Sequence, residues 1–200
     1  MIEHKEGLYA LHTKNTIYMF NVMSTGHLEH LYYGRRIKVD MEKDNGGALP
    51  FMEKHAFPPG NTNQYDAEHG NFSLEDICLE MSSYGKGDIR EPLIEVVHAD
   101  GSYTSDFLFE KAEVSKGKKE FVTLPGSYGK NEEVETLAVT LKDKQYGLSL
   151  VLCYYVYEDC DVITRNTRMI NDSGQAVSIR RLMSMSMDFD TPEYVFTTFN

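Results

Sequence analysis

Residues 136–188 read TLAVTLKDKQYGLSLVLCYYVYEDCDVITRNTRMINDSGQAVSIRRLMSMSMD, and this stretch decides the fold. Apolar and polar residues alternate through it with period two, which places one set of side chains on each face of a sheet. Polar turns interrupt the alternation at residues 142–145, 158–161 and 171–174. Regularly spaced strands with Asx and Gly turns are typical of an antiparallel meander in a β-sandwich. The stretch therefore predicts four consecutive strands in one meander.

The composition fits a single all-β domain over residues 1–200. Apolar residues make up 41% of the chain, and 13 Tyr and 10 Phe favour strands. The net charge of −11 disfavours phosphate backbones and anionic bilayers, so we expect neither nucleic acid nor a membrane as a partner. The acidic residues are interpreted as a solvated surface, because no run of like charges is long enough to form a binding tail.

Three cysteines, Cys78, Cys153 and Cys160, cannot all pair within one chain and form no CxxC motif. No histidine pattern accompanies them, so we predict no metal site, and we predict no other cofactor. Cys153 lies in an alternating run and is predicted to be a small core residue. The chain begins MIEHKEG, without the basic and apolar regions of a secretory signal, and it has no apolar stretch near the ~20 residues of a membrane-spanning helix. A cytoplasmic location is expected.

Further strands are predicted before the deciding stretch. Alternation within residues 8–34 favours a hairpin followed by a third strand. Residues 93–98 predict a strand that ends at the Asp100-Gly101 turn. Because Asp-Gly is a strong hairpin signal, we expect the chain to continue as the partner strand from residue 107.

Residues 40–70 differ from the rest of the chain, because they are rich in Gly, Pro, Asn, Asp and His and have no lasting periodicity. About thirty irregular residues exceed an ordinary connection, so the segment is either disordered or a functional loop. Disordered segments usually lack large apolar side chains. This one carries several: Leu49, Phe51, Met52, Phe57 and Tyr65. We therefore predict a loop that packs against another surface.

The polar turn at residues 85–91, GKGDIRE, is the most conspicuous candidate site. Its two glycines could cradle an anion, with Lys86 and Arg90 beside it. The spacing is not that of a Walker loop, since GxxxxGK[ST] is absent. The alternative, which we favour, is a structural turn in which Asp88, Arg90 and Glu91 pair with neighbouring side chains.

Acidic pairs are plentiful: Asp159 with Asp161, Asp188 with Asp190, and Glu132 with Glu133. Glycoside hydrolysis needs two carboxyl groups, ~5–5.5 Å apart in retaining enzymes and ~6.5–9.5 Å apart in inverting ones. Spacing along the chain does not establish such a pair, and acids are ordinary turn residues. We therefore interpret each pair as structural.

Histidines and arginines offer two further candidates. His27 and His30 are three residues apart in a predicted strand, so their side chains point to opposite faces and do not form a metal site. Four arginines lie within the predicted meander: Arg165, Arg168, Arg180 and Arg181. Such residues either pair with buried carboxylates or line a ligand-facing sheet, and the first arrangement is the commoner.

Six motifs carry a family resemblance. They are GHLEHLYYGRRI (26–37), YGKGDIREPLIEVVHADGS (84–102), LPGSYG (124–129), ETLAVTLKD (135–143), DVITRNTRMIN (161–171) and RRLMSMSMDF (180–189). Together, and in this order, they resemble the N-terminal domain of glycoside hydrolase family 36 α-galactosidases. The resemblance runs from near Leu8 to the last residue.

The resemblance implies an antiparallel β-supersandwich that precedes a catalytic (β/α)₈ barrel and a C-terminal β-domain. It implies retaining hydrolysis of terminal α-galactosides such as melibiose and raffinose. The family's two catalytic aspartates lie in the barrel, in Lys-Trp-Asp and Ser-Asp-Asn motifs that this chain lacks. None of its aspartates therefore inherits a catalytic role, including Asp88, Asp161, Asp188 and Asp190. Family members carry a Gly-x-Trp shortly after the position of Asn200, which implies a longer protein.

The resemblance also implies a homo-oligomer, commonly a tetramer, in which a loop of this domain reaches a neighbouring subunit's active site. Residues 40–70 match that loop. Some relatives carry an acidic residue near position 54 and a basic one near position 70, whereas this chain has Lys54 and Gly70. Lys54 and His55 are the nearest candidates for a substrate-proximal contact.

Two hypotheses follow. The first is the non-catalytic N-terminal domain of a cytoplasmic α-galactosidase, which braces the barrel and supports oligomerisation around an α-galactoside substrate. The alternative is a free-standing carbohydrate-binding module, which the absence of Trp weakens because such modules present aromatic platforms to sugars. The reading frame beyond Asn200 discriminates between them.

Overall fold

The structure is a computed structural model that describes residues 1–41, 63–119, 121, 126–189, 192–193 and 195–198. Ten strands and two single-turn 3₁₀ helices form the regular structure of these residues. The paired strands are all antiparallel, which confirms the predicted all-β class. No helix within this part of the chain is long and apolar enough to cross a membrane.

The first sheet is built from the N-terminal strands in the order β1-β2-β3-β4. Their bounds are β1 Ile2–Lys5, β2 Leu8–His12, β3 Thr16–Val22 and β4 Leu28–Arg35. The hairpin and third strand predicted within residues 8–34 are β2, β3 and β4. The alternation did not predict β1, which pairs with β2 from Ile2 opposite Leu11 to Lys5 opposite Leu8.

The second sheet is a meander in the order β6-β7-β8-β9. Its strands are β6 Phe107–Lys116, β7 Glu135–Asp143, β8 Leu148–Tyr157 and β9 Val162–Asn171, and the 3₁₀ turn η2 Glu158–Cys160 links the last two. The first three strands predicted from the alternation are therefore present and paired. Leu137 and Val139 of β7 and Leu150 of β8 face the core, as period two requires.

The prediction of a fourth strand in this meander is wrong, because the strand belongs to another sheet. β10 Ser178–Leu182 pairs with β5 Ile94–Val97 in a separate two-stranded sheet. It also ends at Leu182 rather than continuing to residue 188. Period-two alternation sets which face a side chain occupies but not which strand lies beside it. Two ion pairs join the strands. Arg180 lies 3.3 Å from Glu95 of β5, and Arg181 pairs with Glu91, which precedes β5.

The predicted hairpin at Asp100-Gly101 is also wrong, although the turn itself is present. A tight turn does form, since the amide of His98 donates to the carbonyl of Ser102 at 2.9 Å and Gly101 has φ of 84°. The strands on either side of it are not partners, however, because β5 pairs with β10 and β6 pairs with β7. The turn passes the chain from one sheet to another.

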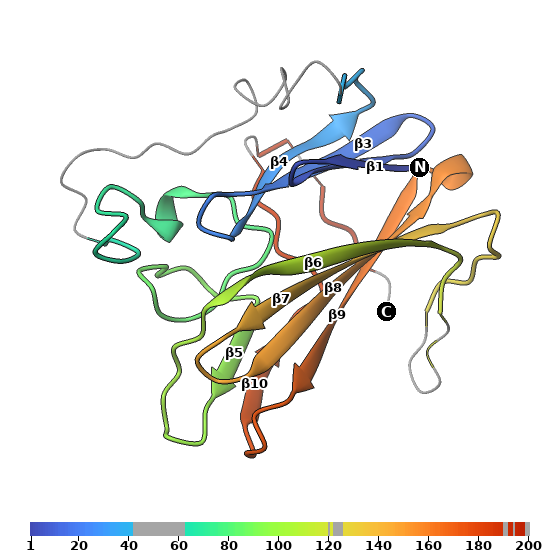
Figure 1. Cartoon of the computed structure of the whole chain (residues 1–200). Coiled ribbons are helices and arrows are strands. Elements are labelled where there is room, and N and C mark those ends of the chain that lie inside the picture. Colours follow the sequence, from blue (N-terminus) through green and yellow to red (C-terminus); the bar gives the residue numbers. More distant parts are fainter. Residues whose placement is uncertain (42–62, 120, 122–125, 190–191, 194, 199–200) are drawn as a thin grey trace.

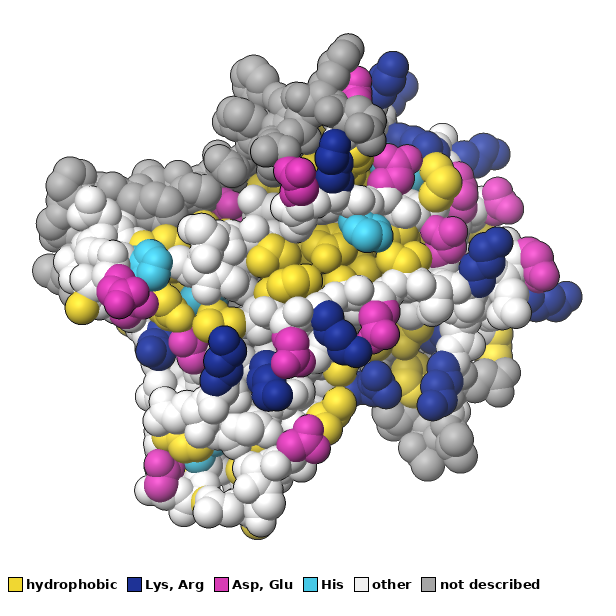
Figure 2. Space-filling model, in the orientation of Figure 1, with side chains coloured by type: hydrophobic (Ala, Val, Ile, Leu, Met, Phe, Trp, Pro, Cys, Tyr) yellow, Lys and Arg dark blue, Asp and Glu magenta, His cyan; other side chains and the backbone are white. Residues whose placement is uncertain are grey.

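The main core lies between the two four-stranded sheets, which Figure 1 shows one above the other. Tyr9, Leu11 and Phe20 project from the first sheet toward Leu152 and Tyr154 of β8, and all five are buried. Each such side chain contributes roughly 1.5–3 kcal/mol when it leaves water. Apolar side chains reach the surface between the first sheet and β6 in Figure 2, where the sandwich is open along one edge.

Residues 40–70 are described only at their two ends. Lys54 and His55 lie outside the described residues. At the near end, Ile37, Val39 and Met41 pack against the outer face of the first sheet, on a cluster of Leu8, Ala10, Ile17, Met19 and Leu31.

The far end of the same segment packs on its own domain. Tyr65 packs with Phe72 and the 3₁₀ turn η1 Leu74–Asp76, and its hydroxyl donates to Asp106 Oδ2 at 2.7 Å. Tyr65 had been predicted to pack against another surface, and the structure places it on the sandwich itself.

Candidate functional site

A cluster of charged and polar side chains lies buried between the two sheets, centred on Glu80. Its carboxylate accepts hydrogen bonds from His30 Nδ1 at 2.8 Å and from the Tyr154 hydroxyl at 2.8 Å, and a further one from the Tyr18 hydroxyl. Arg165 of β9 completes the cluster at 3.1 Å, with its guanidinium over the Tyr154 ring. The side chains of Glu80 and Arg165 are 0% and 5% exposed, so no ligand reaches them.

The charge of Glu80 is stabilised in place. Burial opposes its ionisation, but the Arg165 guanidinium and the hydrogen bonds from His30 and Tyr18 outweigh that cost and lower the pKa of Glu80 to about 2. Burial and the Glu80 carboxylate raise the pKa of Tyr18 well above its usual value. The cluster joins β3, β4, β8 and β9, and we interpret it as the charged clamp that holds the two sheets together.

The polar turn at residues 85–91 is structural, as the favoured interpretation had it. Arg90 Nε donates to Asp88 Oδ1 at 3.0 Å, and its other nitrogens reach the Leu74 carbonyl at 3.0 Å and Asp188 at 3.4 Å. Lys86 Nζ lies 3.7 Å from Asp106. Both cations of the turn thus have carboxylate partners within the chain, and this leaves no free charge for an anion.

Two further acids singled out from the sequence have structural partners. Asp161 accepts from the Asn15 amide at 2.6 Å and the Thr13 hydroxyl at 2.9 Å, and the hydrogen bonds from Asn15 lower its pKa. Glu133 accepts from the Lys130 amide at 2.9 Å, which closes a turn. Asp190 lies outside the described residues.

The two histidines have different partners, and His27 lies just before β4 rather than within it. His27 Nε2 lies 3.3 Å from Asp106, whereas His30 belongs to the Glu80 cluster. Across the described ranges, no three His, Cys, Asp or Glu side chains come together in a way that could hold a metal ion. Arg165, Arg180 and Arg181 have carboxylate partners, but Arg168 has none among the described residues.

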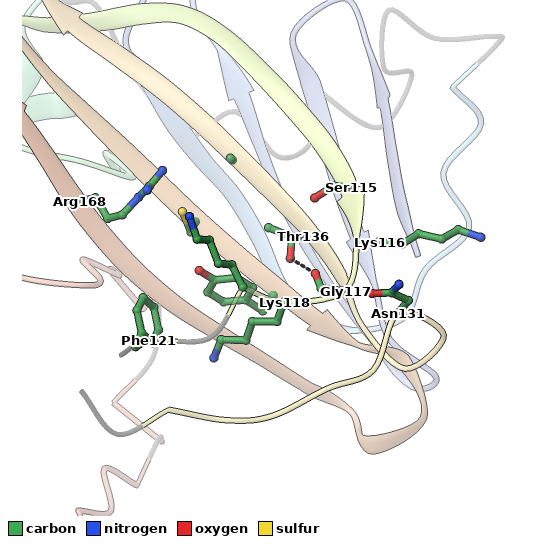
Figure 3. Close-up of a pocket in the computed structure, with 12 residues that line it drawn as sticks. Ser115, Lys116, Gly117, Lys118, Phe121, Asn131, Thr136 and Arg168 are labelled. Atoms are coloured by element: carbon green, nitrogen blue, oxygen red, sulfur yellow. Dashed lines mark hydrogen bonds between the residues drawn. The ribbon is translucent and has the colours of Figure 1, made fainter. Parts of the chain in front are cut away.

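Arg168 lies at a cavity of about 500 Å³ on the outer face of the second sheet. The chain turns back over this face after β6, at Gly117, whose φ is 81°. A Cβ there would lie 2.2 Å from Asn131 Oδ1, so the turn requires glycine. The cavity is lined by Ser115, Lys116, Gly117, Lys118, Lys119, Phe121, Asn131, Thr136, Ala138, Cys153, Tyr155 and Arg168. Figure 3 shows Arg168 and Phe121 toward one end of it, and Lys116 and Asn131 toward the other.

Four of these lining residues are cations and none is a carboxylate. Lys118 Nζ donates to Ser127 Oγ at 2.7 Å and lies 4.4 Å from the centre of the Tyr155 ring, and burial lowers the pKa of Lys118. Lys116, Lys119 and Arg168 form no ion pair with any described residue. The cavity is therefore a basic pocket on a chain whose net charge is −11.

Comparison with known families decides what kind of domain this is. The family described as "Glycosyl hydrolase family 36 N-terminal domain" matches residues 26–200. The chain belongs to this family. It is 32% identical to α-galactosidase AgaA of Geobacillus stearothermophilus over 187 residues, and 29% identical to α-galactosidase Mel36A of Lactobacillus acidophilus over 192 residues. These matches cover 93% and 96% of the chain but 25% of each relative.

Solved family 36 structures share the fold. The galactosidase domain of AgaSK superposes with a TM-score of 0.83 at 28% identity, covering 94% of this chain and 26% of that one. AgaB of Geobacillus stearothermophilus superposes with a TM-score of 0.82 at 29% identity, covering 97% and 26%. The chain thus spans about a quarter of these relatives, and in them the matched region is one part of a larger family 36 enzyme. The family resemblance seen in the sequence is confirmed, as is the β-sandwich it implied.

Two features of this family 36 domain were not found from the sequence. Glu80 gave no local signal, because its four partners come from strands far away in the chain. The basic pocket did leave a trace, since Lys116, Lys118 and Lys119 fall within four residues. The proximity of that run to Arg168 depends on the chain folding back over the sheet.

Proposed function

We propose that this chain is the non-catalytic N-terminal domain of a retaining α-galactosidase, and that it braces the catalytic barrel of that enzyme. The substrates are terminal α-galactosides of the melibiose and raffinose type. The relatives it matches are named α-galactosidases, and a variant of AgaA, 31% identical to this chain, is solved in complex with raffinose. The chain aligns with a quarter of those proteins, which leaves the chemistry to the remainder.

The observation that carries the proposal is an exposed apolar surface near the C-terminal end. Of the fifteen large apolar side chains that are exposed among the described residues, seven lie between Ile179 and Phe196. Val195 and Phe196 are 87% and 88% exposed. Apolar area left in water costs ~25 cal/mol per Å², so this stretch favours burial against a further part of the protein. A domain that precedes a barrel needs such a contact at this end.

The proposal includes an assembly and a location. We expect a homo-oligomer, a tetramer in the full enzyme, in which the loop at residues 40–70 with Lys54 and His55 lies near a neighbour's sugar pocket. We place the protein in the cytoplasm. No disulfide joins its three cysteines, and the exposed thiol of Cys160 suits a reducing compartment.

The test begins with the reading frame beyond Asn200, which we expect to encode a barrel with two catalytic aspartates. The full protein should then hydrolyse an aryl α-galactoside, and the chain of residues 1–200 should not, because retaining hydrolysis needs two placed carboxyl groups. A stop codon after Asn200 together with galactoside binding would support the free-standing carbohydrate-binding module instead. Hydrolysis by residues 1–200 that is lost on mutating one of their aspartates would overturn the proposal.

A second experiment tests the bracing contact. In the full protein, Phe196→Ser should lower the melting temperature by several degrees, because an apolar side chain in the interface is lost. In the isolated chain the same change should have almost no effect, since the side chain is 88% exposed there. Tyr128→Ser is the matched control, because Tyr128 is 80% exposed and its neighbour Ser127 contacts Tyr157 rather than the C-terminal stretch. Equal effects of the two changes in the full protein would argue against the contact.

A further inference from the structure

We propose that the basic pocket on the outer face of the second sheet binds a phosphorylated monosaccharide. The pocket is defined by Lys116, Lys118, Lys119 and Arg168, with Asn131 and Phe121 beside them. This inference goes beyond the proposed function, because a bracing domain needs no small-molecule site of its own.

The first argument is charge. Four cations and no carboxylate are found among the described residues that line the cavity, although acidic residues outnumber basic ones by 31 to 20 in the chain. The acid that shares this face on β6, Glu113, is already paired with Lys111 at 3.0 Å. Cations that line one cavity repel one another, and an anion bound in the cavity relieves that repulsion. The structure therefore favours an anionic occupant.

The second argument is the geometry of the donors. Lys118 is held in place by Ser127 and by the Tyr155 ring, so it is ordered before any ligand arrives. Arg168 presents a planar fork of donors that suits phosphate oxygens, and lysines bind phosphate as point charges. A phosphate monoester carries a charge between −1.5 and −2 and three acceptor oxygens, so it can pair with more than one of these cations.

The third argument is size and polarity. A volume of about 500 Å³ lies within the range of small-molecule sites and exceeds what a single phosphate fills. The remaining lining offers hydroxyl and amide groups at Ser115 and Asn131, which can pair with sugar hydroxyls, and an aromatic face at Phe121 for the apolar side of a sugar ring. A phosphate joined to one sugar ring matches this combination of charged, polar and aromatic groups.

The test is isothermal titration of the 200-residue chain with glucose 6-phosphate, with inorganic phosphate and uncharged glucose titrated in parallel. We expect saturable binding of glucose 6-phosphate with a Kd below about 1 mM. Inorganic phosphate should bind more weakly and glucose should not bind. Added salt should weaken the binding, because the attraction is largely electrostatic.

Two variants locate the site. Arg168→Gln and Lys119→Gln each remove an exposed cation from the pocket, and each should raise the Kd about tenfold or more. Lys142→Gln is the matched control, because Lys142 is an exposed cation of the same sheet that pairs with Glu110 at 3.6 Å outside the cavity. Its Kd should equal that of the wild type, and circular dichroism should show the same β spectrum for all four proteins.

Four results would overturn the proposal. They are the absence of saturable binding, equal binding of glucose, equal binding of inorganic phosphate, and a Kd that Lys142→Gln raises as much as Arg168→Gln does. A fifth comes from the full protein. If the isolated chain binds glucose 6-phosphate and the full protein does not, an acidic segment of the protein itself occupies the pocket, and the pocket is not a ligand site.

Discussion

Arg165 and Arg168 are three residues apart on β9 and meet opposite surroundings. Arg165 points into the sandwich, where Glu80 neutralises it and Tyr18 and Tyr154 surround it. Arg168 points to the outer face, where the other charged residues among the described lining of the cavity are lysines. The same residue type thus serves as part of a clamp on one face of the strand and as a free charge on the other.

The difference shows how to separate structural charge from charge available for binding. A cation whose partner is built into the fold has its electrostatic requirement met, and it contributes to stability. A cation without such a partner adds little to stability and retains its capacity for an outside anion. By this criterion the Glu80 cluster belongs to the fold, and the basic pocket is available for a ligand.

The largest effect expected from this contrast is on the free energy of unfolding of two matched variants. Arg165→Gln leaves the Glu80 carboxylate buried without a positive partner, and such changes cost about 3–5 kcal/mol. Arg168→Gln changes an exposed side chain and should stay within about 0.5 kcal/mol. Urea unfolding of the isolated chain at neutral pH measures both. Similar losses would show that the two faces of β9 do not differ in this way.

The contribution of the Glu80 cluster to stability should depend on pH. The pKa of Glu80 is lowered to about 2 in the folded state from its usual 4.5, so its stabilising contribution is complete above pH 4.5 and is lost as the pH falls toward 2. Linkage makes that contribution roughly 3 kcal/mol. The stability difference between the wild type and Glu80→Gln should therefore shrink by about this amount across that pH range.

Glu113→Gln is the control for the acid titration, because Glu113 is 66% exposed in its pair with Lys111. Its stability difference from the wild type should be small throughout, since exposed pairs contribute about 0–1 kcal/mol. A difference for Glu80→Gln that stays constant from neutral to acid pH would contradict the lowered pKa.

A smaller effect separates two consecutive tyrosines of β8. The hydroxyl of Tyr154 donates to the charged Glu80 at 2.8 Å, and that of Tyr155 donates to the neutral side chain of Asn166 at 2.7 Å. Tyr154→Phe should cost about 1.5–3 kcal/mol and Tyr155→Phe about 0.5–1.5 kcal/mol. Denaturant unfolding, fitted with one m-value for all the proteins, measures both losses of unfolding free energy. A larger loss for Tyr155→Phe would place the stabilising network on the outer face.

Local patterns predicted where strands lie, because the alternation at residues 136–171 reflects which side chains must leave water. The same patterns did not predict which strands pair, and β10 was assigned to the wrong sheet. Its partner β5 lies about 80 residues earlier, and the match depends on Arg180 and Arg181 meeting Glu95 and Glu91.

The candidate sites were less accessible to sequence reasoning than the fold. Arg165 and Arg168 were singled out together, but nothing in the sequence says that one meets Glu80 and the other a group of lysines. Both environments arise from contacts between residues distant in the chain. The assignment of Lys54 and His55 to a substrate-proximal loop stays a prediction, since both residues lie outside the described part of the chain.

The pairing of β10 with β5 has a consequence for synthesis on the ribosome. Val97 emerges about 80 residues before Ser178, which at roughly 5–20 residues per second is a delay of several seconds. Throughout that delay Ile94 and Val96 lie on a strand whose edge has no partner, and unpaired apolar edges recruit other chains. Nascent chains arrested before Ser178 should therefore be cut by protease near β5, and chains that extend past Leu182 should resist. Pairing with β10 is therefore the step of synthesis that covers the exposed edge of β5.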